Sequence, residues 1–167
     1  MGLQEHKNQF TVKATSSEGF SARLLKTFYD EIDELAPTCL NTSGDTVSFT
    51  GGIFRLVMRT NLLGPISRGS ISIISTDDGA AVQYCISFRQ LIAVVTIMIP
   101  ITLIWIWADE GTKSLPFAVI GLSIGWLWLV GMNICISISR FDNFIKKCAK
   151  KAGATEIKRI KTITLSK

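Results

Sequence analysis

The stretch from Leu91 to Ile138 decides the fold: it reads LIAVVTIMIPITLIWIW (91–107), then ADEGTKS (108–114), then LPFAVIGLSIGWLWLVGMNICISI (115–138). Neither apolar run contains a charged side chain. A helix needs about 20 apolar residues to cross a bilayer core of about 30 Å, and each run is near that length. The polar segment between them allows only a tight turn. The pattern predicts a transmembrane helical hairpin over residues 89–138, with spans at about 89–108 and 115–138. A hairpin buried in a soluble core is the alternative.

Charge is distributed unevenly along the 167 residues, whose formal net charge is +5. Residues 139–167 hold nine Lys and Arg against two acidic side chains, net +7, whereas residues 1–88 hold seven basic and nine acidic side chains, net −2. Basic residues beside membrane helices favour the cytoplasmic side, and two spans place both termini on one side. We therefore expect an integral membrane protein of a bacterial inner membrane, with both termini in the cytoplasm.

The first 88 residues are predicted to form a small cytoplasmic domain. Alternating apolar side chains indicate strands at 10–14, 46–50, 53–58, 70–75 and 80–88. Apolar residues three and four apart predict one amphipathic helix, which Ser16 or Ser17 caps and which ends before Pro37. The expected fold class is an α+β membrane protein in which a small antiparallel sheet carries one packed helix.

The connections of this domain follow from glycine, proline and polar residues. Gly51-Gly52 and Asp77-Asp78-Gly79 predict hairpin turns, and residues 38–44 predict a polar loop. Residues 59–69 are expected to form an irregular loop whose apolar side chains pack on the sheet. The last strand runs almost directly into the first span, so we expect the domain to sit against the membrane without a flexible linker.

Residues 139–167 are predicted to form a basic amphipathic helix beside the membrane, followed by a tail. The apolar face contains Phe141, Ile145 and Cys148. The rest of the helix carries the basic residues predicted to contact anionic lipid, Lys146, Lys147, Lys150 and Lys151. The alternative packs the same apolar face on the cytoplasmic domain. Gly153 is expected to end the helix, and residues 154–167 form either a loose tail or a strand at a sheet edge.

The second span carries the residues predicted to contact another helix. Gly121 and Gly125 form a GxxxG pattern, which lets helix backbones approach closely. Trp128 flanks this face. Asn133, nearer the cytoplasmic end of the span, is a further candidate for a contact with a partner. Trp126 and Trp128 both lie too deep for the interfacial belt, so their indole N–H groups are expected to meet Thr96 or Thr102 of the first span or a partner. The glycine face packs either on the first span or on another protein.

The sequence contains no constellation that indicates catalysis, a cofactor or a metal. GxSxG, Walker, HExxH and paired CxxC motifs are missing. His6 is the only histidine and is predicted to be a solvated surface residue. The acidic side chains between 30 and 34 predict a solvated helix face. The four cysteines are scattered, which suits a reducing compartment better than a disulfide framework.

The predicted function is therefore that of a non-enzymatic accessory or scaffold subunit in a larger membrane complex. The apolar runs 91–107 and 115–138 contain no Asp, Glu, Lys, Arg or His, which proton relays and ion-coupled transport usually need. The alternative is a self-assembling membrane pore or a membrane-disrupting effector. The expected partners are membrane lipids, with anionic headgroups at the C-terminal helix, and either another membrane protein or further copies of the chain. We expect no nucleic acid partner.

Overall fold

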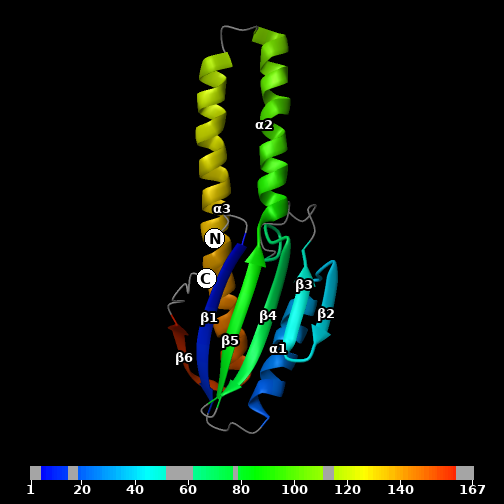
Figure 1. The fold of residues 1–167 in the computed structure, drawn as a ribbon, viewed down its shortest axis with the longest axis vertical. Helices are drawn as coiled ribbons and strands as arrows, with labels where there is room; N and C mark the ends of the chain where they lie inside the picture. The colour runs from blue at the N-terminus through cyan, green and yellow to red at the C-terminus, as the bar shows by residue number, and fades with distance from the viewer. Residues whose placement is uncertain (1–4, 15–18, 52–61, 77–78, 111–114, 161–167) are drawn as a thin grey trace, which may run out of the picture.

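The computed structural model describes residues 5–14, 19–51, 62–76, 79–110 and 115–160 (Figure 1). Its elements, in chain order, are β1 (Glu5–Ala14), α1 (Phe20–Glu34), β2 (Cys39–Ser43), β3 (Thr46–Thr50), β4 (Arg68–Thr76), β5 (Gly79–Ser87), α2 (Arg89–Glu110), α3 (Leu115–Lys151) and β6 (Ala154–Ile160). The six described strands form one antiparallel sheet in the order β2-β3-β4-β5-β1-β6. The predicted α+β class and antiparallel sheet are confirmed.

Two helices cover one face of this sheet, where a single packed helix had been predicted. α1 buries Phe20, Leu24, Phe28 and Ile32 against it. The lower half of α3 buries Phe141, Ile145 and Cys148 in the same core (Figure 1). We call the sheet, α1 and residues 138–151 of α3 the sheet domain. The opposite face of the sheet is left open to view in Figure 1.

α2 and the upper half of α3 extend beyond the sheet domain as an antiparallel pair (Figure 1). Both are long and apolar enough to cross a membrane, and few of their side chains are buried within the protein. α2 follows β5 after one residue, Phe88, which is itself buried. The Gln90 N–H donates to the Ser67 hydroxyl over 2.7 Å and so fixes the start of α2 to the loop before β4. The predicted direct connection between sheet and helix is confirmed.

The second apolar run and the basic helix form one continuous helix, α3, of 37 residues. Of the two arrangements predicted for the basic part, the structure has the one in which its apolar face packs on the sheet domain, and not the one along the membrane surface. The helix ends at Lys151, and Gly153 follows with φ +100°, as the sequence predicted for a C-terminal stop. The next residues form β6, which pairs antiparallel with β1 at the sheet edge and extends to Ile160.

Other boundaries differ from the predictions. Residues 39–43 form edge strand β2, which pairs with β3, where a polar loop had been predicted. The helix α1 begins after Gly19, whose φ is +65°, without a side-chain cap; Ser16 and Ser17 lie outside the described residues. The returning strand predicted at 53–58 and the turn residues Gly52, Asp77 and Asp78 also lie outside them. Leu63 and Ile66 are buried in the core, as predicted for the apolar loop.

Candidate functional site

A single stripe of α3 makes its contacts with the rest of the chain. Trp126 faces α2, and its indole N–H donates to the Thr96 hydroxyl over 3.1 Å. One turn further, Val130 is 1% exposed, and the stripe continues through Ser137 into the core of the sheet domain at Phe141. Of the two tryptophans predicted to meet a threonine of the first span or a partner, Trp126 makes the threonine contact, whereas Trp128 is 68% exposed. The same helix face therefore serves the helical pair and the domain core.

The predicted glycine face lies on another side of α3. Atoms placed at the Cβ positions of Gly121 and Gly125 would meet nothing within 4 Å, so these glycines do not pack on α2. Trp128, three residues beyond Gly125, is 68% exposed. The sequence predicted that this glycine face packs either on the first span or on another protein. Packing on the first span is wrong, because α2 lies against the side of α3 that carries Trp126.

Several polar side chains of the apolar helices donate to carbonyls of their own helix. The Asn133 side-chain amide donates to the Leu129 carbonyl over 2.7 Å. The Ser123 hydroxyl donates to the Val119 carbonyl over 2.7 Å, and Thr102 does the same one turn back in α2. These bonds satisfy the donors without a partner or water. Asn133 thus lies close to the predicted contact region but already has a bond within α3.

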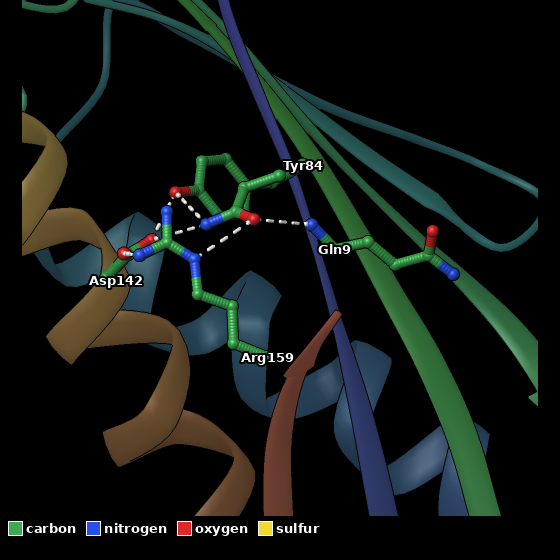
Figure 2. A network of polar contacts seen from close by, with 5 residues as sticks. Gln9, Tyr84, Asp142 and Arg159 are labelled. Atoms are coloured by element: carbon green, nitrogen blue, oxygen red, sulfur yellow. Dashed lines mark hydrogen bonds and ion pairs between the residues drawn. The ribbon is translucent and has the colours of Figure 1, made fainter. Parts of the chain in front are cut away.

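A buried polar network joins α3 to three strands (Figure 2). Asp142 accepts from the Tyr84 hydroxyl of β5 in a short hydrogen bond, and from the Asn8 amide of β1 over 3.2 Å. Its second oxygen lies 3.3 Å from a guanidinium nitrogen of Arg159 on β6. The Asn8 side-chain oxygen in turn accepts from Arg159 and from the Gln9 N–H. Every strand at this edge of the sheet is thereby tied to one carboxylate of α3.

The environment of this network holds Tyr84 in its neutral form. Burial and the hydrogen bond to Asp142 raise the pKa of Tyr84 well above its ordinary value of 10, while Asn8 opposes the change. The neutral hydroxyl can donate to the carboxylate, which an ionised tyrosine could not. The network therefore acts as a structural clamp, in which Asp142 also forms an ion pair with Arg159.

A second clamp joins α3 to α1 through Glu31, whose side chain is only 10% exposed. Lys151 Nζ lies 2.6 Å and Lys147 Nζ 3.8 Å from its carboxylate oxygens. The hydrogen bond from Lys151, opposed by burial, holds the pKa of Glu31 below its ordinary range. The predicted solvated face of α1 is therefore wrong at Glu31. Of the two remaining basic residues, Lys146 Nζ lies 5.9 Å from the Phe10 ring centroid, and Lys150 is exposed.

No protein-family model, curated protein or solved structure matches this chain. Within the described ranges, no group of three or more His, Cys, Asp or Glu side chains is placed to hold a metal ion. What the geometry does offer is a rigid connection: Asp142 and Glu31 fix α3 to the sheet and to α1. α2 has its own connection, since it follows β5 after one residue and its Gln90 N–H bonds to Ser67.

His6 lies at the edge of the Asp142 network and not in free solvent as predicted. It is partly buried, its ring centroid lies 6.0 Å from that of Tyr84, and its Nε2 is buried with no hydrogen-bond partner among the described residues. Burial lowers the pKa of His6 below its ordinary value of 6.5; Asp142 opposes this change and Arg159 adds to it. The folded protein therefore favours the neutral imidazole.

This preference predicts an acid-sensitive stability. Because the folded-state pKa is depressed, the contribution of His6 is present above its ordinary pKa and is lost as pH falls through that value. We expect the full-length chain in detergent to unfold at lower urea concentration at about pH 5.5 than at about pH 7.5. His6→Gln, which stays neutral, should lose less between the two pH values. An equal loss in both proteins would contradict the assignment.

Sequence reasoning missed Asp142, Glu31, Asn8, Tyr84 and Arg159. A signal existed for two of them: Asp142 follows buried Phe141, and Glu31 precedes buried Ile32, so both lie at the edges of apolar helix stripes. Acidic residues at such edges are candidates for buried pairs. Nothing in the sequence indicated their partners, because those lie on other elements.

Proposed function

We propose that this chain is integral to a membrane through residues 89–138, with both termini in the cytoplasm, and serves as a non-catalytic accessory or scaffold subunit of a larger membrane complex. The apolar surfaces of α2 and α3 support the membrane placement. The side chains of Trp105, Phe117 and Trp128 are 71%, 80% and 68% exposed. Exposing so large an apolar surface to water is unfavourable, whereas lipid can cover it. The basic residues flanking the pair support the cytoplasmic orientation.

The outward glycine face carries the proposal of a partner. Gly121 and Gly125 lie one turn apart with open space before them, and exposed Trp128 borders them. Small residues permit close helix approach in lipid, where packing contributes most of the association energy. Since α2 packs on a different face of α3, a helix that packs on this glycine face would come from another chain. The favoured partner is a transmembrane helix of a different, larger membrane protein.

The continuous α3 supports a scaffold role for the sheet domain. A partner helix bound at Gly125 would hold α3, and α3 is fixed to the sheet through Asp142 and to α1 through Glu31. The domain would then take a defined position and orientation beside the complex. A domain on a flexible linker would gain no such orientation.

The internal hydrogen bonds of the spans favour the subunit over the alternative, a homo-oligomeric pore. A water-filled pore would use free hydroxyl and amide groups along its lining, whereas Ser123, Thr102 and Asn133 bond to their own helices. The lipid contact predicted for the basic helix is also disfavoured. Lys147 lies nine residues beyond Ile138 in the same helix, about 14 Å along its axis, and it pairs with Glu31 of the sheet domain.

The test of the subunit role uses the second span. We expect Gly125→Leu to reduce recovery of the partner by about tenfold, because the added side chain separates two closely packed helices. Trp128→Ala should reduce recovery as well. Trp126→Ala is the matched control: it removes a tryptophan that faces α2, and should reduce recovery less. The measurement is affinity purification from native membranes, with quantitative mass spectrometry of co-purified membrane proteins.

The level of each variant in the membrane must match that of the original chain. If all three variants retain every co-purified protein, the second span is a plain anchor and the groove has no partner. If Gly125→Leu leaves a closed assembly of this chain alone and that assembly conducts ions, the pore replaces the subunit as the better proposal.

A further inference from the structure

The open face of the sheet contains a hollow of about 740 Å³ at the end nearest the helical pair. This volume lies within the range of small-molecule sites, about 300–1,000 Å³. Its floor is formed by the outward side chains of β3, β4 and β5, and its upper rim by the first turns of α2, where Arg89, Gln90 and Ala93 lie. The hollow is separate from the Asp142 network, which lies on the helix-covered face.

Strand register explains why the hollow exists. Ser48, Ser70 and Cys85 lie opposite one another on β3, β4 and β5. The rung nearer α2 places Arg68 between Thr50 and Ser87. Alternation along a strand sends all of these side chains to the open face. The short side chains of Ser48, Ser70 and Cys85 leave space in one row of the sheet, and the long side chain of Arg68 borders this space in the next row. The floor of the hollow therefore presents hydroxyl groups beside an arginine.

The hollow carries uncompensated positive charge. Arg68 and Arg89 both line it and are exposed, and neither forms an ion pair within the described part of the chain. Glu5 also lines the hollow, so the side chains of the lining have a net charge of +1. Glu5 lies on β1, where it pairs with Ser87 of β5 on the side away from Arg68. Two arginines are well suited to bind the oxygens of a phosphate group.

The position of the hollow suggests where such a group could come from. Arg89 is the first residue of α2, and the apolar run begins two residues later at Leu91. If α2 crosses the membrane as proposed above, Arg89 lies at the level of the lipid headgroups. Arg68 is held close to that level because β4 pairs with β5, the strand that leads into α2.

We propose that this hollow binds a phosphate ester that also carries hydroxyl groups, such as the phosphoglycerol headgroup of an anionic phospholipid. Arg68 and Arg89 would bind the phosphate oxygens. Ser48, Ser70, Thr50 and Ser87 would exchange hydrogen bonds with the hydroxyl groups, and Glu5 would accept one more. A choline headgroup fits less well, because it has no hydroxyl hydrogen to donate and brings a positive charge near two arginines.

The test uses the purified full-length chain in a non-ionic detergent. Native mass spectrometry after exposure to equal phosphatidylglycerol and phosphatidylcholine should show retained phosphatidylglycerol. Arg68→Gln with Arg89→Gln should reduce that retention by at least about tenfold, as expected for the loss of two charge-assisted contacts. Ser70→Leu, which fills the floor and keeps both arginines, should reduce it too. Arg23→Gln with Lys26→Gln is the control, since it removes the same charge from exposed positions of α1.

Calorimetry with glycerol 3-phosphate separates the two sources of ligand. Weak binding of glycerol phosphate beside strong retention of phosphatidylglycerol identifies a lipid headgroup. Arginine-dependent binding of glycerol phosphate without lipid preference supports the phosphate site and identifies a soluble ester as its ligand. Equal retention in the arginine variant and the α1 control, with no glycerol phosphate binding, overturns the proposal. The proposed phosphate site depends on the proposed membrane placement only where the ligand is a lipid. The lipid experiment contains no partner protein, so a negative result there is distinguishable from a negative result in the Gly125 experiment.

Discussion

Replacing Phe141 with alanine should lower the free energy of unfolding of the sheet domain by about 3–5 kcal/mol, the usual cost of removing a fully buried phenylalanine. The Phe141 side chain is 0% exposed. Its ring centroid lies 5.0 Å from that of Tyr84 and 6.0 Å from that of Phe49. It therefore joins α3 to both β5 and β3, and its loss opens a cavity between helix and sheet that neither side can close without moving.

The measurement uses Cys148, seven residues along the same helix. Its side chain is fully buried, and burial, with a smaller effect of Glu31, raises the pKa of its thiol to about 12. The folded protein should therefore protect this thiol from alkylation. Maleimide pulses along a urea titration, followed by mass spectrometry of the Cys148 peptide, report opening of the domain. Phe117→Ala is the control, because Phe117 lies on the same helix and is 80% exposed. Equal midpoints for the two variants would contradict the described core.

The elements predicted well from the sequence are those with strong periodicity. The alternation around Val12 and Val82 identified β1 and β5, and the spacing of Phe20, Leu24 and Phe28 identified α1. β2 was missed because an edge strand needs little apolar surface. Leu40 is its only large apolar side chain, and the backbone bonds to β3 that hold it are invisible in the sequence.

The continuity of α3 was available in the sequence but was not recognised. Trp126, Val130, Ser137, Phe141 and Ile145 recur at helical spacing across the predicted boundary at residue 138. Hydrophobicity alone divides this helix, because it separates the apolar run from the basic one. The spacing of the buried side chains does not change at the boundary, and the structure follows that spacing.

The polar network could not have been predicted by any local rule. Tyr84 and Asp142 are 58 residues apart, and Asn8 and Arg159 are 151 apart. Their meeting depends on two facts of topology: α3 returns beneath the sheet, and β6 adds to β1. Neither fact was fixed by the sequence pattern, which left residues 154–167 as either a tail or an edge strand.

Asp142→Ala should lower the free energy of unfolding by about 2–3 kcal/mol, because it leaves the buried Tyr84 hydroxyl without its acceptor and the Asn8 amide with only its 3.4 Å hydrogen bond to the Tyr84 hydroxyl. The ion pair with Arg159 should contribute little of this loss, since the arginine side chain is 52% exposed. Tyr84→Phe should cost less, about 1 kcal/mol, because Asp142 keeps Asn8 and Arg159 as partners. The double variant should cost less than the sum of the two, because both changes remove the same hydrogen bond.

The same Cys148 alkylation measures all three variants, and Asp30→Ala is the matched control because it removes an exposed aspartate from α1. Asp142→Asn separates charge from hydrogen bonding: its side-chain oxygen can still accept from Tyr84, so it should retain much of the stability that Asp142→Ala loses. If Asp142→Ala behaves like Asp30→Ala, the network does not hold α3 to the sheet. If the single costs of Asp142→Ala and Tyr84→Phe add fully, their hydrogen bond is not coupled in the folded protein. Without the Asp142 network, the attachment of α3 to the sheet domain, on which the scaffold role depends, would rest on Glu31 and the apolar core, while α2 would keep its direct connection through Phe88 and the Gln90–Ser67 hydrogen bond.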